Sequence, residues 1–254
     1  MPRSAEFRFY AELNDFLEPA GRGRDRLYHF DGRPAVKDAI EAQQVPHTEV
    51  AMILANGVAV GFGHHLCGGE RVAVFPAFAR FDVTGLAVTP ARRRGEVAAG
   101  LRFVVDVNLG KLARWLRLLG FDTCYGNDID DPELVRIAVR DRRVLLTRDR
   151  RLLHHKALAH GYWVRAVDPE RQVAEVMNRF ALRSAIRPFH RCLACNGLID
   201  PVPKQRVAHR LEPGTRRHYD TFYQCRDCAK VYWKGPHFAR LEDAVERMSA
   251  PALT

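Results

Sequence analysis

The sequence has no uninterrupted apolar stretch of the roughly 20 residues that a membrane-spanning helix requires. Its first residues, MPRSAEFRFYAELNDF, lack the continuous apolar segment of a secretory signal peptide. Neither a Gly-x-x-x-x-Gly-Lys-Ser/Thr loop nor a Gly-x-Gly-x-x-Gly fingerprint is present, which argues against an NTPase or a dinucleotide-dependent dehydrogenase. These absences predict a soluble cytoplasmic protein with no membrane segment.

Charge is unevenly spread along the 254 residues. Residues 1–85 hold 9 Lys/Arg against 11 Asp/Glu, whereas the remainder holds 31 against 19. A basic body favours a polyanionic partner such as RNA, although a solvated, Arg-rich surface explains the same charge equally well. At this length the chain can form one large domain or two to three small ones.

Four of the six cysteines form two Cys-x-x-Cys pairs, Cys192/Cys195 and Cys225/Cys228. In a cytosolic chain this pattern favours metal over disulfides. Two such knuckles supply the four thiolates of a structural Zn²⁺ site, whereas a redox dithiol needs only one reactive pair. Cys67 and Cys124 stand alone and are each interpreted as a small buried or half-buried apolar residue.

Aromatic and cationic residues alternate around the second cysteine pair, a composition that can stack bases and hold phosphates. A small aromatic core explains the aromatic residues slightly better, whereas RNA contact explains the arginines slightly better. The residues are Arg216, Arg217, Tyr219, Phe222, Tyr223, Lys230, Tyr232 and Trp233.

Residues 1–85 are expected to form a small α+β domain. Strands are predicted at 7–10, 26–30, 51–55, 58–60 and 72–76, with a helix at 36–42 and a hairpin turn at Asn56-Gly57. This order resembles a ubiquitin-like β-grasp fold. The small sulfur carriers of that fold end in a free Gly-Gly, but here the chain continues as PAFARFDV, so a docking, RNA-guiding or structural role is expected, including a possible protein partner. Residues 86–100 are interpreted as a linker.

Residues 101–184 alternate between strand and helix signals. A buried strand, 103–105, ends at Asp106, and a helix follows over 109–119 with Lys111, Arg114 and Arg117 on its other faces. A second helix is predicted to begin at Asp131, acting as N-cap before Pro132, and a second buried strand, 144–147, leads to Asp149. Further predictions are a helix over 152–161, a strand over 162–167 and a helix after Asp168.

The two acids that follow these strands predict a cation site. Parallel strands deliver their carboxyl ends to one edge of a sheet, where two carboxylates can share Mg²⁺ or Mn²⁺. Asp128, Asp130, Asp131 and Glu133 offer further acids, of which Asp128 or Asp130 is freer if Asp131 is the N-cap. The neighbouring cations are Lys111, Arg114 and Arg148, which could steady phosphate charge in a transition state.

The chain resembles the Mut-seven C-terminal (Mut-seven-C) RNase family in the run Asp106-x-x-Leu109-Gly110-Lys111-Leu112-Ala113-Arg114-Trp115-Leu116-Arg117, in Thr147-Arg148-Asp149 and in the two cysteine pairs. The resemblance implies a PIN-like parallel-sheet domain at 101–184, preceded by a ubiquitin-like β-grasp domain at 1–85 and followed by a zinc-ribbon region and C-terminal helix at 185–254. It also implies metal-binding roles for Asp106 and Asp149, with a loop acid such as Asp128 as the third.

The predicted function is metal-dependent hydrolysis of RNA, with Mg²⁺ or Mn²⁺ as the catalytic cofactor and the zinc ribbon aiding RNA binding. One alternative is a non-catalytic RNA-binding adaptor with a degenerate PIN-like site. Another is a protein-interaction module recruited through the β-grasp domain.

Overall fold

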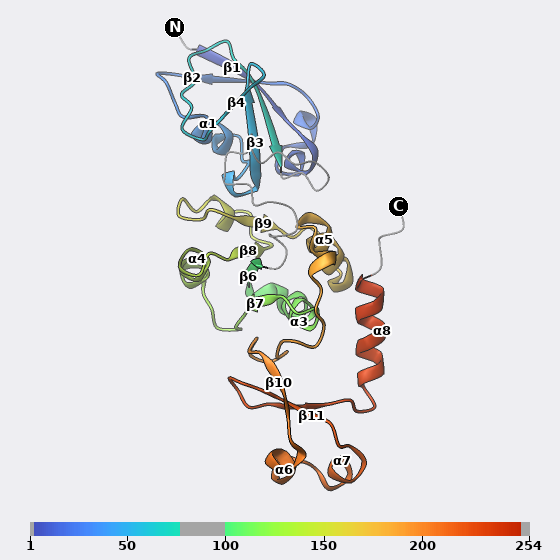
Figure 1. Ribbon diagram of the computed structural model, residues 1–254. Helices are drawn as coiled ribbons and strands as arrows, with labels where there is room; N and C mark the ends of the chain where they lie inside the picture. The colour runs from blue at the N-terminus through green and yellow to red at the C-terminus, as the bar shows by residue number, and fades with distance from the viewer. Residues whose placement is uncertain (1–2, 77–99, 250–254) are drawn as a thin grey trace.

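The computed structural model describes residues 3–76 and 100–249 and contains three separate sheets (Figure 1). The N-terminal sheet lies at one end of the molecule, the parallel sheet in the middle, and a small antiparallel sheet at the other end. Among the described residues, no helix combines the length and the apolar character that crossing a bilayer demands. The predicted linker falls outside the described residues, except for Gly100.

The N-terminal domain is a β-grasp, as the sequence predicts. Its sheet has the order β2-β1-β5-β3-β4, with β1 and β5 parallel at the centre and the other pairs antiparallel. Asn56 and Gly57 both have positive φ, as the predicted hairpin turn between β3 and β4 requires. The elements are β1 (Arg3–Phe9), β2 (Arg26–Phe30), α1 (Val36–Ala42), β3 (Val50–Ala55), β4 (Val58–Val60) and β5 (Arg71–Pro76), with 3₁₀ helices η1 (Ala11–Phe16), η2 (Pro19–Gly21) and η3 (His47–Glu49).

The middle domain is a three-layer α/β structure around an all-parallel sheet of order β7-β6-β8-β9. Phe103 and Val105 of β6 face the apolar cluster of α3 and α5, whereas Val104 faces that of α4. Successive side chains of a strand point to opposite faces, so an unbroken apolar run buries both. The elements are β6 (Arg102–Val105), η4 (Val107–Leu109), α3 (Gly110–Leu118), β7 (Asp122–Cys124), α4 (Asp131–Arg140), β8 (Val144–Thr147), η5 (Leu152–His154), β9 (Gly161–Trp163), α5 (Pro169–Arg179) and η6 (Leu182–Ala185).

One predicted helix of this domain is wrong. Residues 152–161 form only the short turn η5, and Gly161 starts β9 rather than ending a helix. The leucines of this segment are drawn into two different cores: Leu153 into that of the β-grasp domain, Leu152 and Leu158 into that beneath α4. The leucines on one face of a helix could not pack into both cores.

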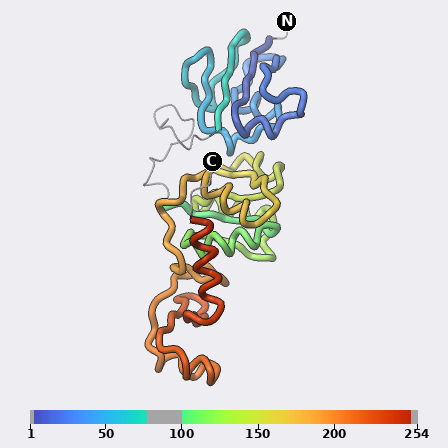
Figure 2. The backbone as a smooth tube through the Cα atoms, turned by 90° about the vertical axis from the view of Figure 1, so that its right-hand side faces the viewer, coloured from blue at the N-terminus to red at the C-terminus, as the bar shows by residue number. Residues whose placement is uncertain are grey.

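The third sheet is a ribbon of order β10-β11-β12, from which the chain returns to the middle domain. The closing helix α8 runs back beside the α/β domain (Figure 2). Its Met248 joins the apolar cluster that contains Val173 and Met177 of α5. The elements are β10 (Ile199–Val202), α6 (Lys204–Val207), η7 (Ala208–Arg210), α7 (Pro213–His218), β11 (Phe222–Cys225), β12 (Val231–Trp233) and α8 (Phe238–Ser249).

The β-grasp domain is docked on the edge strand β9 of the middle sheet. The Thr48 hydroxyl donates to the Leu153 carbonyl oxygen at 3.1 Å, and Nε2 of His47 lies 2.8 Å from the carbonyl oxygen of Leu158. The fully buried Glu49 side chain accepts the Trp163 N–H at 2.6 Å, which satisfies a donor on the otherwise unpaired side of β9.

Arg165 completes this contact between the two domains. Its Nη2 lies 3.5 Å from Glu49 Oε2, and its Nε donates to Asp15 Oδ2 at 2.8 Å. Burial raises the pKa of Glu49, against the opposing effect of Arg165 and Arg179. Because this carboxylate has so little access to water, these partners must compensate its negative charge.

Replacing Glu49 with alanine is therefore expected to lower the free energy of unfolding by about 3 kcal/mol, because Arg165 loses a buried partner and the Trp163 N–H loses its acceptor. Urea denaturation measures the change. The exposed Glu18→Ala variant is the control from the same domain, and equal effects of the two changes would contradict this account of the docking.

Candidate functional site

Asp106 and Asp149 lie at the same edge of the parallel sheet. Strands β6 and β8 are neighbours in the register Val105↔Leu146, so both strands deliver their carboxyl ends side by side. The Asp106 N–H extends this pairing by donating to the Leu146 carbonyl oxygen at 3.0 Å. Two acids distant in sequence thus follow neighbouring strand ends, at the edge where open α/β sheets bind ligands.

Thr147 connects the two acids. Its hydroxyl donates to Asp106 Oδ2 at 2.7 Å and accepts the Asp149 N–H at 2.9 Å. Thr147 is fully buried and Asp106 is 5% exposed. Both oxygens of the Asp106 carboxylate have partners, because Oδ2 accepts this hydroxyl and Oδ1 accepts the Asn108 N–H at 3.5 Å. The sequence places Thr147 within the motif Thr147-Arg148-Asp149 but assigns it no role at the site, although a hydroxyl two residues before the second acid is a usable signal.

Asp131, at the start of α4, is an acid whose pKa the charges of Asp106 and Asp149 help to raise. Partial burial and the negative charges of Asp106, Asp149 and Asp130 raise its pKa. The predicted N-cap assignment is wrong: Asp130 is the N-cap of α4 and accepts the Glu133 N–H at 2.9 Å, while Asp131 is the first residue of the helix. The cap therefore leaves the Asp131 carboxylate available to the acid edge.

The other predicted residues have contacts of their own. Asp128 is exposed, and a Cβ added at Gly126 would lie 3.1 Å from its Oδ1, so its side chain folds back on its own loop. Glu133 pairs with Arg136 at 2.8 Å. Arg148 donates to the Ala166 carbonyl oxygen at 3.3 Å.

Lys111 and Arg114 are exposed at the start of α3. The loop of Asp128 approaches this helix through Tyr125, whose hydroxyl lies 3.2 Å from the Val107 carbonyl oxygen and 2.6 Å from Asn127 Oδ1. Tyr125 packs so closely over Gly110 that no side chain fits there.

The carboxylates suit a hard divalent cation in their chemistry, because oxygen ligands with concentrated negative charge are what Mg²⁺ and Mn²⁺ select. They are less tightly gathered than the cysteines. Within residues 3–76 and 100–249, only the cysteine cluster brings three or more ligand atoms within 4.8 Å of one another.

The four cysteines converge on one point and can bind a metal ion. Their sulfurs all lie within 4.8 Å of one another, with Cys192 3.6 Å from Cys228 and Cys195 3.4 Å from Cys225. The two knuckles have the same turn geometry. The Asn196 N–H donates to the Cys192 carbonyl oxygen at 2.9 Å, and the Ala229 N–H to that of Cys225 at 3.1 Å.

Of the aromatic residues around the knuckles, Tyr232 and Phe222 serve the ribbon itself. The Tyr232 hydroxyl lies 3.0 Å from the Cys192 sulfur and accepts the Leu193 N–H at 3.2 Å. Phe222 is 1% exposed. The interpretation as core is confirmed for Phe222, whereas Tyr232 is half-buried and Trp233 is exposed at the surface.

Arg117 joins the first knuckle to the middle domain. It is 4% exposed, although the sequence places it on a non-core face of its helix. Its guanidinium donates to the carbonyl oxygens of Thr123 at 2.9 Å, Leu193 at 3.2 Å and Ala194 at 2.9 Å. The cysteine knuckle is therefore held by a charged side chain from the helix that follows the acid edge.

Arg117→Lys is expected to lower the free energy of unfolding by about 3 kcal/mol, because an ammonium group cannot reach these carbonyl oxygens simultaneously and two to three charged hydrogen bonds are lost. The exposed Arg114→Lys on the same helix is the matched control and should change stability by less than about 0.5 kcal/mol. Chemical denaturation of both variants measures the change. An unchanged free energy of unfolding in Arg117→Lys would contradict the proposed attachment.

Comparisons with known proteins match both halves of the chain. A family model described as the Mut7-C RNAse domain matches residues 101–245, more than half of the sequence, and a model described as Mut7-C ubiquitin matches residues 2–82. The crystal structure of H. volcanii small archaeal modifier protein 1 matches 30% of this chain and 99% of its own, at 22% identity and a TM-score of 0.25. The search of curated proteins found no match.

Proposed function

The chain belongs to the Mut7-C RNase family, and we propose that it is a metal-dependent ribonuclease that cuts RNA at its acid edge. The observation that carries the proposal is the placement of Asp106 and Asp149 at adjoining strand ends, joined through the Thr147 hydroxyl. Family membership supports RNA as the substrate. The cytoplasmic location expected from the sequence stays a prediction.

In this proposal Asp106, Asp149 and Asp131 hold the catalytic cation. Mg²⁺ or Mn²⁺ bound there would activate a water molecule for attack on a phosphodiester and stabilise the leaving oxygen. Thr147 keeps the Asp106 carboxylate oriented, because its hydroxyl occupies one oxygen of that group. The raised pKa of Asp131 supports its inclusion, since mutual repulsion of carboxylates is relieved by a cation.

The remaining predicted residues keep supporting roles in the proposal. Lys111, Arg114 and Arg148 would steady the phosphate charge from positions beside the acids. Asp128 is the less favoured third acid, because its side chain folds back on its own loop. The β-grasp domain is a candidate for recruiting a protein partner, through surfaces that its contact with β9 leaves open.

We propose zinc as the metal of the cysteine cluster, because four thiolates in a closed set are the ligands of structural Zn²⁺. The ribbon would then be a rigid platform next to the catalytic domain. A non-catalytic RNA-binding adaptor is the alternative function. The looser grouping of the carboxylates favours it, and it predicts salt-sensitive RNA binding without metal-dependent turnover.

Asp106→Asn is expected to reduce Mn²⁺-dependent cleavage of labelled single-stranded RNA by about 10²- to 10³-fold, because the best-oriented carboxylate is lost. RNA affinity should stay equal or rise, since a negative charge is removed. Cleavage is followed by gel electrophoresis and affinity by fluorescence anisotropy. Unchanged cleavage would reject the role assigned to Asp106, and absence of turnover in the unaltered chain would favour the adaptor.

A matched pair of loop variants refines this test. Asp131→Asn and Asp128→Asn each remove one charge from the segment around the start of α4, and Asp131 is the one whose pKa burial and the strand-end acids raise. We expect the first change alone to weaken Mn²⁺ binding. Because its pKa is raised, Asp131 takes up a proton at a higher pH than an ordinary aspartate. As the pH is lowered, the Mn²⁺ affinity of the unaltered chain should therefore begin to fall at a higher pH than that of Asp131→Asn.

The purified chain is expected to contain one Zn²⁺, measured by native mass spectrometry. Cys225→Ser should lose the ion or bind it far more weakly, because a thiolate of the closed set is replaced by a neutral hydroxyl. The expectation that Cys67 is buried or half-buried is wrong, because this lone cysteine is exposed, and Cys67→Ser should keep the ion. Equal zinc content in both variants would show that the knuckles are not the site.

A further inference from the structure

The segment between β10 and β11, residues 203–221, forms a basic lobe at the end of the molecule opposite the β-grasp domain (Figure 1). It carries five Lys/Arg against two Asp/Glu. Lys204 pairs with Asp220 at 2.7 Å, but Arg206, Arg216 and Arg217 have no acidic partner within the part of the chain that the structure describes. These arginines are exposed and free to meet an external anion.

Internal packing does not explain this charge. Val207 is the only buried residue of α6, and α7 has none. The lobe therefore has little core of its own, and it adds cations rather than apolar contacts to the ribbon. A surface built in this way is suited to a polyanion.

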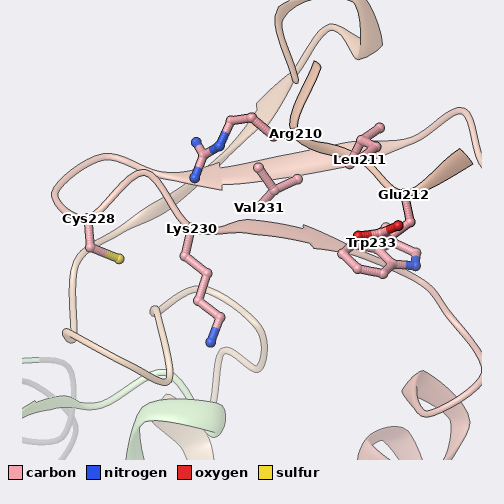
Figure 3. A pocket seen from close by; sticks show the side chains of 7 residues that line it. All are labelled: Arg210, Leu211, Glu212, Cys228, Lys230, Val231 and Trp233. Carbon is pink, nitrogen blue, oxygen red and sulfur yellow. The ribbon is translucent and has the colours of Figure 1, made fainter. Parts of the chain in front are cut away.

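A pocket of about 310 Å³ lies between this lobe and strand β12 (Figure 3). Its volume falls in the range of small-molecule sites. Arg210, Leu211 and Glu212 line it from the lobe, and Cys228, Lys230, Val231 and Trp233 line it from the second knuckle and β12. The pocket thus combines an aromatic ring, two cations, a single carboxylate and one sulfur of the cysteine cluster.

Trp233 offers a fixed aromatic surface in this pocket. Its ring centroid is 6.5 Å from that of Phe222, and a Cβ at Gly235 would lie 2.8 Å from the indole nitrogen, so the ring is held along that edge. Even so, Trp233 is 37% exposed. A large aromatic ring that is held in place yet open to solvent is what a nucleobase stacks upon.

Neither cation of the pocket has a carboxylate partner among residues 3–76 and 100–249. Arg210 Nη1 donates to the Ala229 carbonyl oxygen at 2.7 Å, which fixes the guanidinium and leaves its remaining N–H groups available. The Lys230 ammonium lies 6.0 Å from the centre of the Tyr232 ring. Glu212 adds an acceptor for the amino or imino groups of a base.

We propose that this pocket holds one unpaired nucleotide of single-stranded RNA, its base stacked on Trp233 and its phosphates directed to Arg210, Arg216 and Arg217. The inference rests on the proposed function for its choice of RNA as the polyanion. An unpaired base is required, because a base inside a duplex cannot present its face to the indole. The ribbon tip thereby holds the strand at a place separate from the acid edge that cuts it.

The test uses the full-length, zinc-loaded chain carrying Asp106→Asn, so that binding is measured without cleavage. Anisotropy of a labelled 20-nucleotide single-stranded RNA should show about five- to a hundredfold weaker binding for Trp233→Ala, and near-normal binding for Trp233→Phe, which keeps a ring for stacking. Duplex RNA of the same length should not distinguish the variants. Zinc content and circular dichroism verify folding.

Salt dependence tests the arginines. Each phosphate contact with a single strand contributes about 0.7 to the slope of log K against log salt, so Arg216→Ala/Arg217→Ala should reduce the slope by about 1.4. The control Arg24→Ala/Lys156→Ala removes the same charge from exposed positions in the other two domains and should leave the slope unchanged.

Equal binding by Trp233→Ala and its parent, or equal slopes for the two double variants, would overturn the pocket proposal. If the chain with native Asp106 still cleaves RNA, the nuclease proposal stands although the pocket proposal fails. Conversely, Trp233-dependent binding without any turnover would reject the nuclease and retain the RNA site. If an acidic protein binds the lobe while RNA does not, the polyanion was wrongly identified and the proposal fails.

Discussion

The parallel pairing of β6 with β8 is the constraint on which the rest of the structure depends. It brings the carboxyl end of each strand to one edge, and the Asp106 N–H prolongs the ladder beyond the last strand residue. The same pairing buries apolar side chains on both faces, so helices must cover the sheet on each side. An acid that follows either strand therefore has its position fixed by the backbone. The Thr147 hydroxyl orients the Asp106 carboxylate, and the Arg151 N–H donates to the Asp149 carboxylate at 2.8 Å.

Much of this arrangement could be predicted from sequence, because the signals are local. The runs 103–105 and 144–147 are apolar and each is followed by an acid, and the cysteine pairs define their knuckles within four residues. The Asn56-Gly57 turn specifies its hairpin in the same way. These features depend on neighbouring residues alone, and the strands, the turn and the cysteine cluster are confirmed.

The remainder depends on contacts between distant segments. Strand β7 has only three residues and exists because β6 pairs with it. The N-cap of α4 is Asp130 and not Asp131. Sequence patterns do not locate the end of a helix to within one residue. Arg117 is exposed on a helical projection and buried in the fold, because the knuckle residues Leu193 and Ala194 cover it.

The ribbon is joined to the middle domain by several contacts. Arg117 holds its first knuckle, and α8 returns from its last strand to place Met248 in the core beside α5. Asn196 of the knuckle also accepts the Thr123 N–H of β7 at 2.9 Å. The geometry of the cysteine site and that of the acid edge are consequently linked through α3 and β7, the elements that lie between them.

One side chain has a wider consequence. Leu153 belongs by sequence to the α/β domain, yet it is fully buried in the apolar cluster of the β-grasp domain. Neither domain can complete its interior alone, since separating them leaves a leucine-sized void on one side and exposed apolar surface on the other. The interior of the domain that carries the acids is therefore closed in part by the N-terminal domain, and we expect the two to unfold together.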